Sequence, residues 1–455
     1  MRNICLLLDL YELTMAQSYF ETKINTYATF DLFNRNLPMN RSFFISCGLE
    51  DVLRYLEDLR FDSESLDFLE SKRLFSKDFL NYLSKFKFRG EVFALREGEI
   101  FFPNEPILRI TAPIIEAQIV ESFLLNTINL QTTIATKAAR CVLAAKNKGI
   151  YDFSLRRTQG YDAGLKAARS SYIAGCKGTS NVLAGRTYKI PIVGTMAHSY
   201  VMSFESELEA FSAFSKTFPE NSILLLDTYD NLKGLKNAIL VAKELEKGGK
   251  RLKGVRLDSG DLVKLSKKIR RILDKNQLNY VKIFASGNLD EYKIYHLLKQ
   301  GAPIDDFGVG TNMGVSVDSP YTDVIYKISE ISDKDGQFLP TMKLSKGKVT
   351  YPGRKQIYRV KDKDGFYKED ILGLEDERSE GEPLLLCAMK DGRIISSFPT
   401  LDEIQLYLKE NLRRLPARFK ELKKKSTYPV KISALLKKLT LNLEKTLKTR
   451  STRGI

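Results

Sequence analysis

The sequence predicts an α/β protein: an irregular, TIM-like (β/α) barrel with a second mixed α/β domain built from N-terminal and C-terminal segments. Between residues 151 and 309, strand-like runs alternate with helical patterns, as in βαβ units with a parallel sheet. Six or more such units in succession favour a closed or nearly closed barrel over a two-layer sheet. On both sides of this region, short strand patterns are broken by Gly and Pro, which indicates a second domain.

The barrel elements follow from short apolar runs and from apolar residues at helical spacing. The expected strands are Tyr151–Leu155, Ile190–Gly194, Ile223–Asp227, Gly254–Asp258, Val281–Ala285 and Asp306–Val309. The helical patterns between them include Lys233–Leu245, Asp261–Leu273 and Leu289–Leu298.

These patterns divide the chain into four segments. Residues 1–125 mix helical and extended patterns, and residues 126–327 form the barrel, whose rim is expected to carry the active site. Residues 328–400 are rich in strand patterns and are expected to complete the N-terminal domain. Residues 401–455 form a basic helical tail.

The composition is that of a globular, intracellular protein. Of the 455 residues, 43% are hydrophobic and 28% are charged, which excludes wholesale disorder. The five cysteines are scattered without a C-x-x-C pair, so we expect a reducing compartment and no structural zinc site. No run approaches the roughly 18 apolar residues of a membrane span. We therefore expect a soluble cytoplasmic protein with no membrane partner.

The net charge of +16 first suggests a polyanionic partner such as nucleic acid. The charge is uneven, because residues 401–455 contain 15 Lys and Arg against 5 Asp and Glu. Nucleic-acid binding through this tail is therefore the alternative function from another class, and it would be steeply salt-dependent. We do not expect it, since the tail has few aromatic residues and its apolar spacing suits packing on the protein body.

His198 lies in the segment GTMAHS, after an expected strand and beside small and hydroxyl residues. A histidine at a strand end can act as a nucleophile or as a general base. A lone histidine is more often a structural residue, and this is the competing interpretation. The other histidine, His296, stands within a helical pattern and has no such surroundings.

Arg256 and Asp258 stand two residues apart in an extended segment, so both side chains point to the same side of the strand. At a barrel rim, an arginine can bind phosphate bidentately, and an aspartate can accept from ribose hydroxyls or hold Mg²⁺. Ser259 is expected to cap the following helix. The competing interpretation is a structural ion pair with a helix cap.

Further strand ends suit phosphate binding. Gly287 and the pair Gly310 and Thr311 would let backbone N–H groups approach a phosphate, although ordinary tight turns have the same pattern. Arg156 and Arg157 follow the first expected barrel strand and suit a polyphosphate, with a solvated surface pair as the alternative. Together, these strand ends describe a phosphorylated-sugar site at a barrel mouth.

Along nearly its whole length, the sequence resembles nicotinate phosphoribosyltransferase. The matching segments include DLYELTMAQSYF, GVRLDSGDL, FASGNLDE, IDDFGVGTNMGVS and the phosphohistidine-type segment PIVGTMAHSYVMSFESELEAF. One small departure is Leu8, where the family often has Thr. The resemblance implies the irregular barrel, the second mixed domain, and a homodimer whose active sites lie at the subunit interface.

The resemblance also implies the reaction, whose substrates would be nicotinate, 5-phosphoribosyl 1-pyrophosphate and ATP. The products would be nicotinate mononucleotide and pyrophosphate, the first step of NAD salvage from nicotinate, with ATP hydrolysed to ADP and phosphate. Mg²⁺ would neutralise the pyrophosphate leaving group, held through the substrate, with Asp258 as the candidate protein ligand.

By resemblance, His198 is transiently phosphorylated by ATP, and Arg256 and Asp258 lie near the phosphoribosyl group. Tyr11 and Thr195 match residues of the nicotinate site, with Tyr11 stacking on the pyridine ring across the dimer interface. The remaining implied residues are Gly287, Gly310 and Thr311 as the 5′-phosphate cradle, and Arg157 as a contact of the nicotinate carboxylate or the phosphates.

Ser180 is relevant to which pyridine base, nicotinate or nicotinamide, the enzyme would accept. In the related nicotinamide enzymes the similar segment reads K-G-T-Asp, whereas this chain has Ser180 after Lys177, Gly178 and Thr179. A carboxylate there would repel nicotinate, whereas Ser180 and nearby cations would accept it. Two alternatives stay open: Ser180 only caps a helix, or the chain is a nicotinamide- or quinolinate-using relative.

Overall fold

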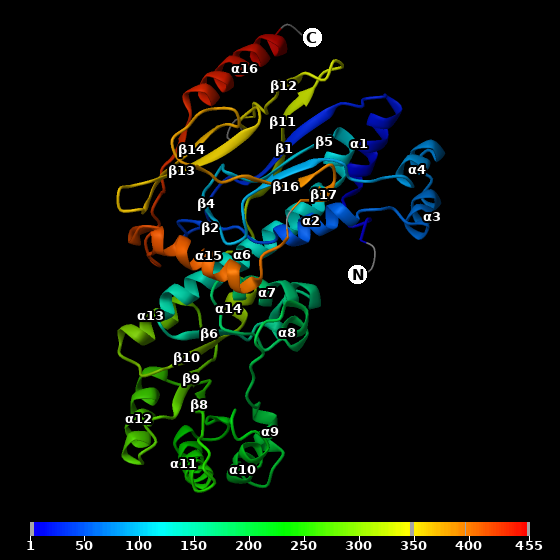
Figure 1. Cartoon of the computed structure of the whole chain (residues 1–455). Coiled ribbons are helices and arrows are strands. Elements are labelled where there is room, and N and C mark those ends of the chain that lie inside the picture. Colours follow the sequence, from blue (N-terminus) through cyan, green and yellow to red (C-terminus); the bar gives the residue numbers. More distant parts are fainter. Residues whose placement is uncertain (1–3, 346–349, 396, 453–455) are drawn as a thin grey trace. The chain divides into compact units, whose positions relative to one another are not determined.

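The computed structural model describes residues 4–345, 350–395 and 397–452. The chain divides into two compact units (Figure 1). Unit 1 combines the chain up to Thr133 with the chain from Tyr321 onward, and unit 2 is Ile134–Pro320. Within the described ranges, no helix has the length and apolar character needed to cross a membrane.

The main sheet of unit 1 interleaves strands from both ends of the chain. At its centre, β1 (Tyr27–Asn34) pairs antiparallel with β11 (Val324–Ser332) on one side and with β5 (Pro106–Pro113) on the other. β1 is buried from Ala28 to Asn34, so it forms part of the core. The strand order is β12 (Phe338–Pro340), β11, β1, β5, β3 (Glu91–Ala94), β16 (Leu386–Lys390) and β17 (Arg393–Ile394).

A second sheet in unit 1 comes from the C-terminal segment alone. Its strand order is β15 (Glu382–Pro383), β13 (Lys355–Lys361), β14 (Tyr367–Leu374) and β18 (Val430–Ile432). β13 and β14 are antiparallel, whereas β18 runs parallel to β14. A separate two-stranded sheet joins β2 (Phe44–Ile45) to β4 (Ile100–Phe101).

Helices of unit 1 contribute apolar faces to the core. In α2 (Leu49–Asp58), the buried side chains Val52, Leu53 and Leu56 recur at helical spacing. The boundary between the units falls within α6. The other helices are α1 (Leu10–Glu21), α3 (Ser63–Ser71), α4 (Lys77–Leu83), α5 (Ile114–Ile119), α6 (Glu121–Ala145), α15 (Leu401–Arg414) and α16 (Ala434–Thr452).

The basic tail begins with α15, which is an integral helix of unit 1. The Thr400 hydroxyl accepts from the Glu403 backbone N–H, and the Glu403 carboxylate accepts from the Thr400 backbone N–H, which forms a capping box. The side chains that this helix buries are Ile404, Leu408, Asn411 and Leu412. The first part of the tail therefore packs on the body of unit 1, as its apolar spacing predicts.

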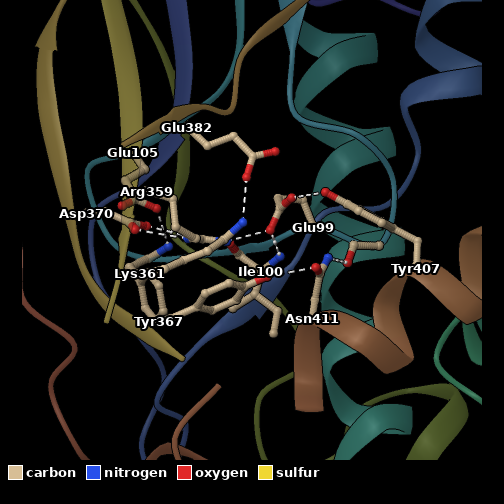
Figure 2. A network of polar contacts seen from close by, with 12 residues as sticks. Glu99, Ile100, Glu105, Arg359, Lys361, Tyr367, Asp370, Glu382, Tyr407 and Asn411 are labelled. Carbon is tan, nitrogen blue, oxygen red and sulfur yellow. Dashed lines mark hydrogen bonds and ion pairs between the residues drawn. The ribbon is translucent and has the colours of Figure 1, made fainter. Parts of the chain in front are cut away.

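A buried polar network also ties α15 to the strands (Figure 2). Tyr407 of α15 donates its hydroxyl proton to Glu99, which precedes β4. Glu99 pairs with Arg359 of β13, and the Arg359 guanidinium also binds Asp370 of β14. The Arg359 side chain is 1% exposed, so this network lies inside unit 1.

Unit 2 is built around a five-stranded parallel sheet. The strand order is β6 (Gly149–Asp152), β10 (Asp306–Val309), β9 (Lys282–Ala285), β8 (Gly254–Leu257) and β7 (Ile223–Leu225). All four pairs of neighbours are parallel. The expectation of a parallel α/β sheet is therefore confirmed, although β6 begins and ends earlier than the sequence pattern predicts.

The expected strand Ile190–Gly194 is not formed. Ile192 makes only an isolated bridge to Thr179, which in turn bridges to Asp152 at the end of β6. Pro191 interrupts the run because it has no backbone N–H to donate. Among the described residues, no pairing between Ile192 and β7 closes the sheet. The closed barrel therefore stays a prediction.

Helices follow the strands of unit 2, and one expected cap was wrong. Asp261, rather than Ser259, caps α12, because its carboxylate accepts from the Lys264 N–H at 3.1 Å. The Ser259 hydroxyl instead donates to Asp227 at 2.6 Å. The helices are α7 (Tyr161–Ile173), α8 (Val182–Tyr188), α9 (His198–Met202), α10 (Glu207–Thr217), α11 (Asn231–Lys247), α12 (Leu262–Lys275), α13 (Glu291–Lys299) and α14 (Thr311–Gly314).

Candidate active site

Polar residues of unit 2 gather where its strands end. β7, β8 and β9 are parallel neighbours, so the residues that follow them meet at one edge of the sheet. Thr228 follows β7, Asp258 follows β8, and Ser286 follows β9. This edge, which is the carboxyl edge of the sheet, is where open α/β folds place their ligands.

Arg256, at the end of β8, holds this edge together. Its guanidinium donates through Nε to the Ser286 hydroxyl at 2.8 Å and through Nη1 to the Thr195 hydroxyl at 3.0 Å. Nη2 donates to the Asp258 carboxylate at 2.7 Å. We call these four residues, Thr195, Arg256, Asp258 and Ser286, the Arg256 cluster. Within the described residues, three of the five N–H donors of the guanidinium are engaged, so two can bind an anion.

Phe153 supports the guanidinium from another direction. The carbon at the centre of the Arg256 guanidinium lies 5.6 Å from the centroid of the Phe153 ring, within reach of a cation–π interaction. Phe153 follows β6, and its ring stacks on Phe284 of β9. An aromatic face therefore borders the cationic group at the edge of the sheet.

Asp258 remains ionised within the cluster. Burial favours its neutral form, but the hydrogen bond from Ser286 and the pairing with Arg256 outweigh burial and lower the pKa of the carboxyl. His198 adds a smaller contribution in the same direction, so the two side chains lie within electrostatic reach of each other. The edge therefore presents a fixed negative charge beside a fixed positive one.

His198 is the first residue of α9, where its ring is exposed. The ring Nδ1 lies 3.2 Å from the Thr228 hydroxyl. The other histidine, His296, is also exposed but lies on α13, with its Nε2 3.0 Å from the Gln300 amide. Of the two histidines, only His198 therefore lies with the strand-end residues.

The two glycine turns approach each other and the cluster. Gly287 adopts φ +92°, and a Cβ there would overlap the Asp258 carbonyl oxygen, so only glycine fits. Gly310 and Thr311 begin α14, and the next side chain, Asn312, donates to the Asn288 carbonyl at 3.2 Å. The structure thus brings together the residues expected to cradle the 5′-phosphate.

In the described ranges, the other expected residues of unit 2, Arg156, Arg157 and Ser180, make no hydrogen bond to the Arg256 cluster. Arg156 and Arg157 form an exposed 3-10 turn after β6, and in the part of the chain described here neither guanidinium binds a cluster residue. The Ser180 N–H donates to the Asp152 carbonyl at 2.8 Å. Asn181, rather than Ser180, caps α8, so the capping alternative for Ser180 was wrong.

Tyr11 belongs to unit 1, at the start of α1. Its ring is 44% exposed and lines a cavity of about 470 Å³. Burial of the hydroxyl, helped by Glu121, raises the pKa of Tyr11. The other residues around this cavity are Leu7, Leu8, Asp9, Ser122, Leu125, Asn126, Asn129, Tyr321, Thr322 and Val324.

Beside Tyr11, Glu12 is a buried carboxyl group. Burial raises the pKa of Glu12 to about 7, although its Oε1 accepts from both the backbone N–H and the hydroxyl of Ser122. In the unfolded chain this carboxyl titrates near 4.5. The folded state therefore binds more protons between those pH values, and stability falls as the pH rises through them.

Glu12→Gln is expected to remove this loss of stability. At pH 8 the free energy of unfolding should exceed that of the parent by about 2 kcal/mol, and the difference should vanish near pH 4. Urea unfolding across this pH range measures it, with Glu21→Gln on the exposed end of the same helix as the control. A constant difference between parent and variant at every pH would contradict the prediction.

A magnesium site made only of protein side chains does not fit the structure. In the ranges that are described, no group of three or more His, Cys, Asp or Glu side chains could hold a metal ion. Asp258 has one carboxylate oxygen, Oδ1, committed to Arg256 and Ser286. The donor set therefore fits Mg²⁺ only if substrate oxygens supply most of the ligands.

A guanidinium, an ionised carboxylate and glycine turns meet at one carboxyl edge, an arrangement typical of enzymes that bind phosphorylated substrates. Family models match most of the chain: the nicotinate phosphoribosyltransferase N-terminal domain at residues 6–129, the family itself at 149–358, and its C-terminal domain at 378–440. The chain belongs to the nicotinate phosphoribosyltransferase family.

Relatives match over most of their own length. A nicotinate phosphoribosyltransferase of Mycobacterium tuberculosis is 46% identical, with 93% of this chain and 90% of the relative covered. That of Bacillus subtilis is 38% identical, with 93% and 92% covered. The crystal structure of human nicotinic acid phosphoribosyltransferase superposes with a TM-score of 0.85 at 29% identity, covering 96% of this chain and 99% of the human one.

Sequence reasoning missed three residues of this edge. In the sequence, Ser286 lies beside Gly287, which alone drew attention to that segment. Thr228 lies just after the expected strand Ile223–Asp227, and Phe153 lies within the expected strand Tyr151–Leu155. The signal for Ser286 was its position, because it follows β9 as Asp258 follows the neighbouring β8. For Phe153 no sequence signal separates an aromatic residue at a site from one in the core.

Proposed function

We propose that this protein is an ATP-coupled nicotinate phosphoribosyltransferase. It converts nicotinate, 5-phosphoribosyl 1-pyrophosphate, ATP and water to nicotinate mononucleotide, pyrophosphate, ADP and phosphate, in the salvage of nicotinate to NAD. The observation that carries the proposal is the Arg256 cluster, with two free guanidinium donors beside an ionised Asp258. Membership of the family and the similarity to the human enzyme support it.

In this reaction, the bond between ribose C1 and pyrophosphate breaks as the pyridine nitrogen attacks C1. Positive charge develops on the ribose, and the Asp258 carboxylate, fixed by Arg256 and Ser286, stabilises it. The free Arg256 donors bind an anionic group of the substrates. The backbone of Gly287, Gly310 and Thr311 receives the 5′-phosphate, and Arg157 the remaining anionic groups. Bound with the pyrophosphate, Mg²⁺ supplies charge neutralisation of the leaving group.

His198 is proposed as the residue that ATP phosphorylates. A neutral imidazole is a competent nucleophile toward a γ-phosphate. His198 lies on an exposed helix start within electrostatic reach of Asp258, so a phosphoryl group on it would stand beside the Arg256 cluster. ATP cleavage is thereby linked to substrate binding and turnover at one edge of the sheet.

We further propose a cytoplasmic homodimer with active sites at the subunit interface, where Tyr11 of one subunit stacks on the nicotinate of the other. The exposed, cavity-lining position of Tyr11 supports this role. The five cysteines, all within the described ranges, form no disulfide with one another, which supports a reducing compartment.

The proposal is tested by supplying phosphoribosyl pyrophosphate with nicotinate, nicotinamide or quinolinate in parallel. We expect product from nicotinate, with ATP increasing the rate. A clear preference for nicotinamide or quinolinate would show that the chain is one of the alternative relatives. A quinolinate enzyme would also release carbon dioxide, which is measured in the same assay.

Ser180→Asp is expected to discriminate against nicotinate. A carboxylate at this position repels the nicotinate carboxylate and can pair with the amide of nicotinamide, so the KM for nicotinate should rise about tenfold. The matched control is Ser180→Asn, which has similar volume without the charge. Steady-state kinetics of both variants with both bases test it, and an equal rise of KM in the two variants would show that size matters rather than charge.

A further inference from the structure

Asp152, the last residue of β6, is a buried carboxylate that the proposed reaction has not yet used. It is 1% exposed, so it lies too deep to touch a substrate. Its Oδ2 accepts from the Thr179 hydroxyl at 2.7 Å, next to Ser180 in the sequence. We propose that Asp152 is a positioning residue, which fixes Ser180 through Thr179 and so sets the preference of the enzyme for nicotinate over nicotinamide. This inference rests on the proposed function, in which Ser180 lies beside the nicotinate carboxylate.

The Asp152 carboxylate is itself held in one orientation. Its Oδ1 accepts from the backbone N–H of Ser154 at 2.9 Å and from the Ser154 hydroxyl at 2.6 Å. Ser154 has no room to move away, because it is fully buried and a Cβ on Gly314 would overlap its own Cβ. Rotation of the carboxylate would break the bonds of both oxygens, so the place of Oδ2 opposite Thr179 is defined.

Thr179 connects this carboxylate to the backbone on both sides of Ser180. The hydroxyl that donates to Asp152 also accepts from the Asn181 N–H at 3.0 Å. The Ser180 N–H donates to the carbonyl of the same Asp152 at 2.8 Å. The side chain and the main chain of Asp152 thus hold two successive residues, and the Ser180 backbone follows the position of Asp152.

On its other side, Thr179 contacts a segment that forms no strand in the described chain. Its N–H donates to the Pro191 carbonyl at 3.0 Å, and its carbonyl accepts from the Val193 N–H at 3.0 Å. These bonds make only an isolated bridge between Thr179 and Ile192. In contrast, β6 pairs along its whole length with β10 of the parallel sheet. Asp152 therefore ties Thr179 directly to the sheet.

The Ser180 hydroxyl is available to a ligand. The residue is half-buried, and within the described ranges its hydroxyl makes no hydrogen bond. A hydroxyl without a protein partner can donate to a substrate carboxylate only where the backbone places it. A misplacement of about 1 Å is enough to weaken such a contact severely. The contact between Asp152 and Thr179 therefore affects the choice between a carboxylate and an amide on the base.

The experiment compares the base preference of the full-length protein with that of variants in this contact. Nicotinate and nicotinamide are supplied together, so the ratio of the two mononucleotides formed gives the ratio of their kcat/KM values. Thr179→Val keeps the shape of the side chain without the hydroxyl, and Thr179→Ser keeps the hydroxyl. Ser222→Ala is the control, because it removes another fully buried hydroxyl of unit 2, which donates to the Phe218 carbonyl at 2.6 Å just before β7.

We expect Thr179→Val to lower the preference for nicotinate about tenfold, as loss of one buried hydrogen bond predicts. The KM for phosphoribosyl pyrophosphate should stay unchanged, because the contact acts on the base and not on the ribose. Thr179→Ser should restore most of the preference, and Ser222→Ala should keep that of the parent. A parent-like preference in Thr179→Val, or an equal fall in Ser222→Ala, would overturn the role of Asp152.

Two further variants test the assignment to Asp152 and Ser180. Asp152→Asn keeps the volume but has one oxygen in place of two, so it cannot accept from both Ser154 and Thr179, and the preference should fall to a similar degree. In Ser180→Ala, the added change Thr179→Val should have little effect, because the hydroxyl that it places is already absent. A full additional loss in that double variant would show that Thr179 acts elsewhere and would overturn the proposal.

The proposed function fails in a different way. A parent that forms nicotinamide mononucleotide in preference overturns both the proposed function and the role of Asp152. A parent that prefers nicotinate, with the same preference in Thr179→Val, overturns the role of Asp152 alone. If Thr179→Val does not fold, the preference of Asp152→Asn decides the question, and a parent-like value there overturns the proposal.

Discussion

Replacing His198 by alanine is expected to abolish ATP hydrolysis and the stimulation of the reaction by ATP, while a residual rate of phosphoribosyl transfer remains. Alanine provides no nucleophile for the γ-phosphate, so ATP cleavage should fall by about 10³-fold or more. The hydrogen bonds of the Arg256 cluster do not involve the imidazole, because Arg256 donates to Thr195, Asp258 and Ser286. Binding and transfer of the ribosyl group should therefore survive in part.

The chain offers a matched control in its other histidine. His296 is exposed on α13 and contacts only Gln300 among the hydrogen bonds found for its ring in the described chain, so His296→Ala should retain full ATP coupling. Release of ADP and formation of nicotinate mononucleotide are measured together for both variants. Unchanged ADP release in His198→Ala would refute the proposed role of this residue.

Arg359→Met is expected to cause the largest loss of stability. The Arg359 guanidinium binds both oxygens of Asp370, at 3.0 and 2.6 Å, and donates to the Ile100 carbonyl at 2.7 Å. Glu99 is its third partner. Figure 2 shows how these groups converge on the one guanidinium. Without it, two carboxylates that are at most 4% exposed would be left inside unit 1 with no cation between them.

Removing one partner of a buried ion pair typically costs about 3–5 kcal/mol. Burial and the neighbouring Asp370 raise the pKa of Glu105 well above its usual range, and Arg359 opposes this shift, so its loss would disfavour the charged form of a third carboxyl group. Denaturant unfolding of the full chain measures the change. Lys361→Met is the control on the same strand, because Lys361 pairs with Glu382 at the surface, where a pair contributes about 1 kcal/mol or less. Equal losses in the two variants would contradict the prediction.

The parallel layer of unit 2 could be predicted because its strands are short apolar runs bounded by Gly, Pro and polar residues. Asp306–Val309 forms the strand that the sequence predicts, residue for residue. Ile190–Gly194 reads in the same way, but Pro191 limits it to one bridge at Ile192. The local sequence pattern predicts that a segment is extended. To form a strand, the segment also needs a neighbouring strand whose backbone N–H and carbonyl groups can pair with its own.

The candidate site likewise contains residues that the sequence predicts and residues that it does not. The sequence pattern predicts Arg256 and Asp258 as site residues and the resemblance adds Thr195, and the three are hydrogen-bonded in the structure. Ser286 and Thr228 were missed because their importance comes from the neighbouring strand, and strand order cannot be derived from one segment. Tyr11 was placed by resemblance alone, and its exposed position on α1 leaves its role a proposal.

The interleaved sheet of unit 1 has a consequence for synthesis on the ribosome. Ala28 of β1 pairs with Ile331 of β11, about 300 residues later in the chain. At elongation rates of roughly 5–20 residues per second, β11 is synthesised on the order of 15–60 s after β1. Unit 2 is continuous in sequence and emerges completely during that interval. The β11-facing edge of β1 must therefore stay unpaired while about 300 further residues are made, and such an open strand edge is prone to pairing with other chains.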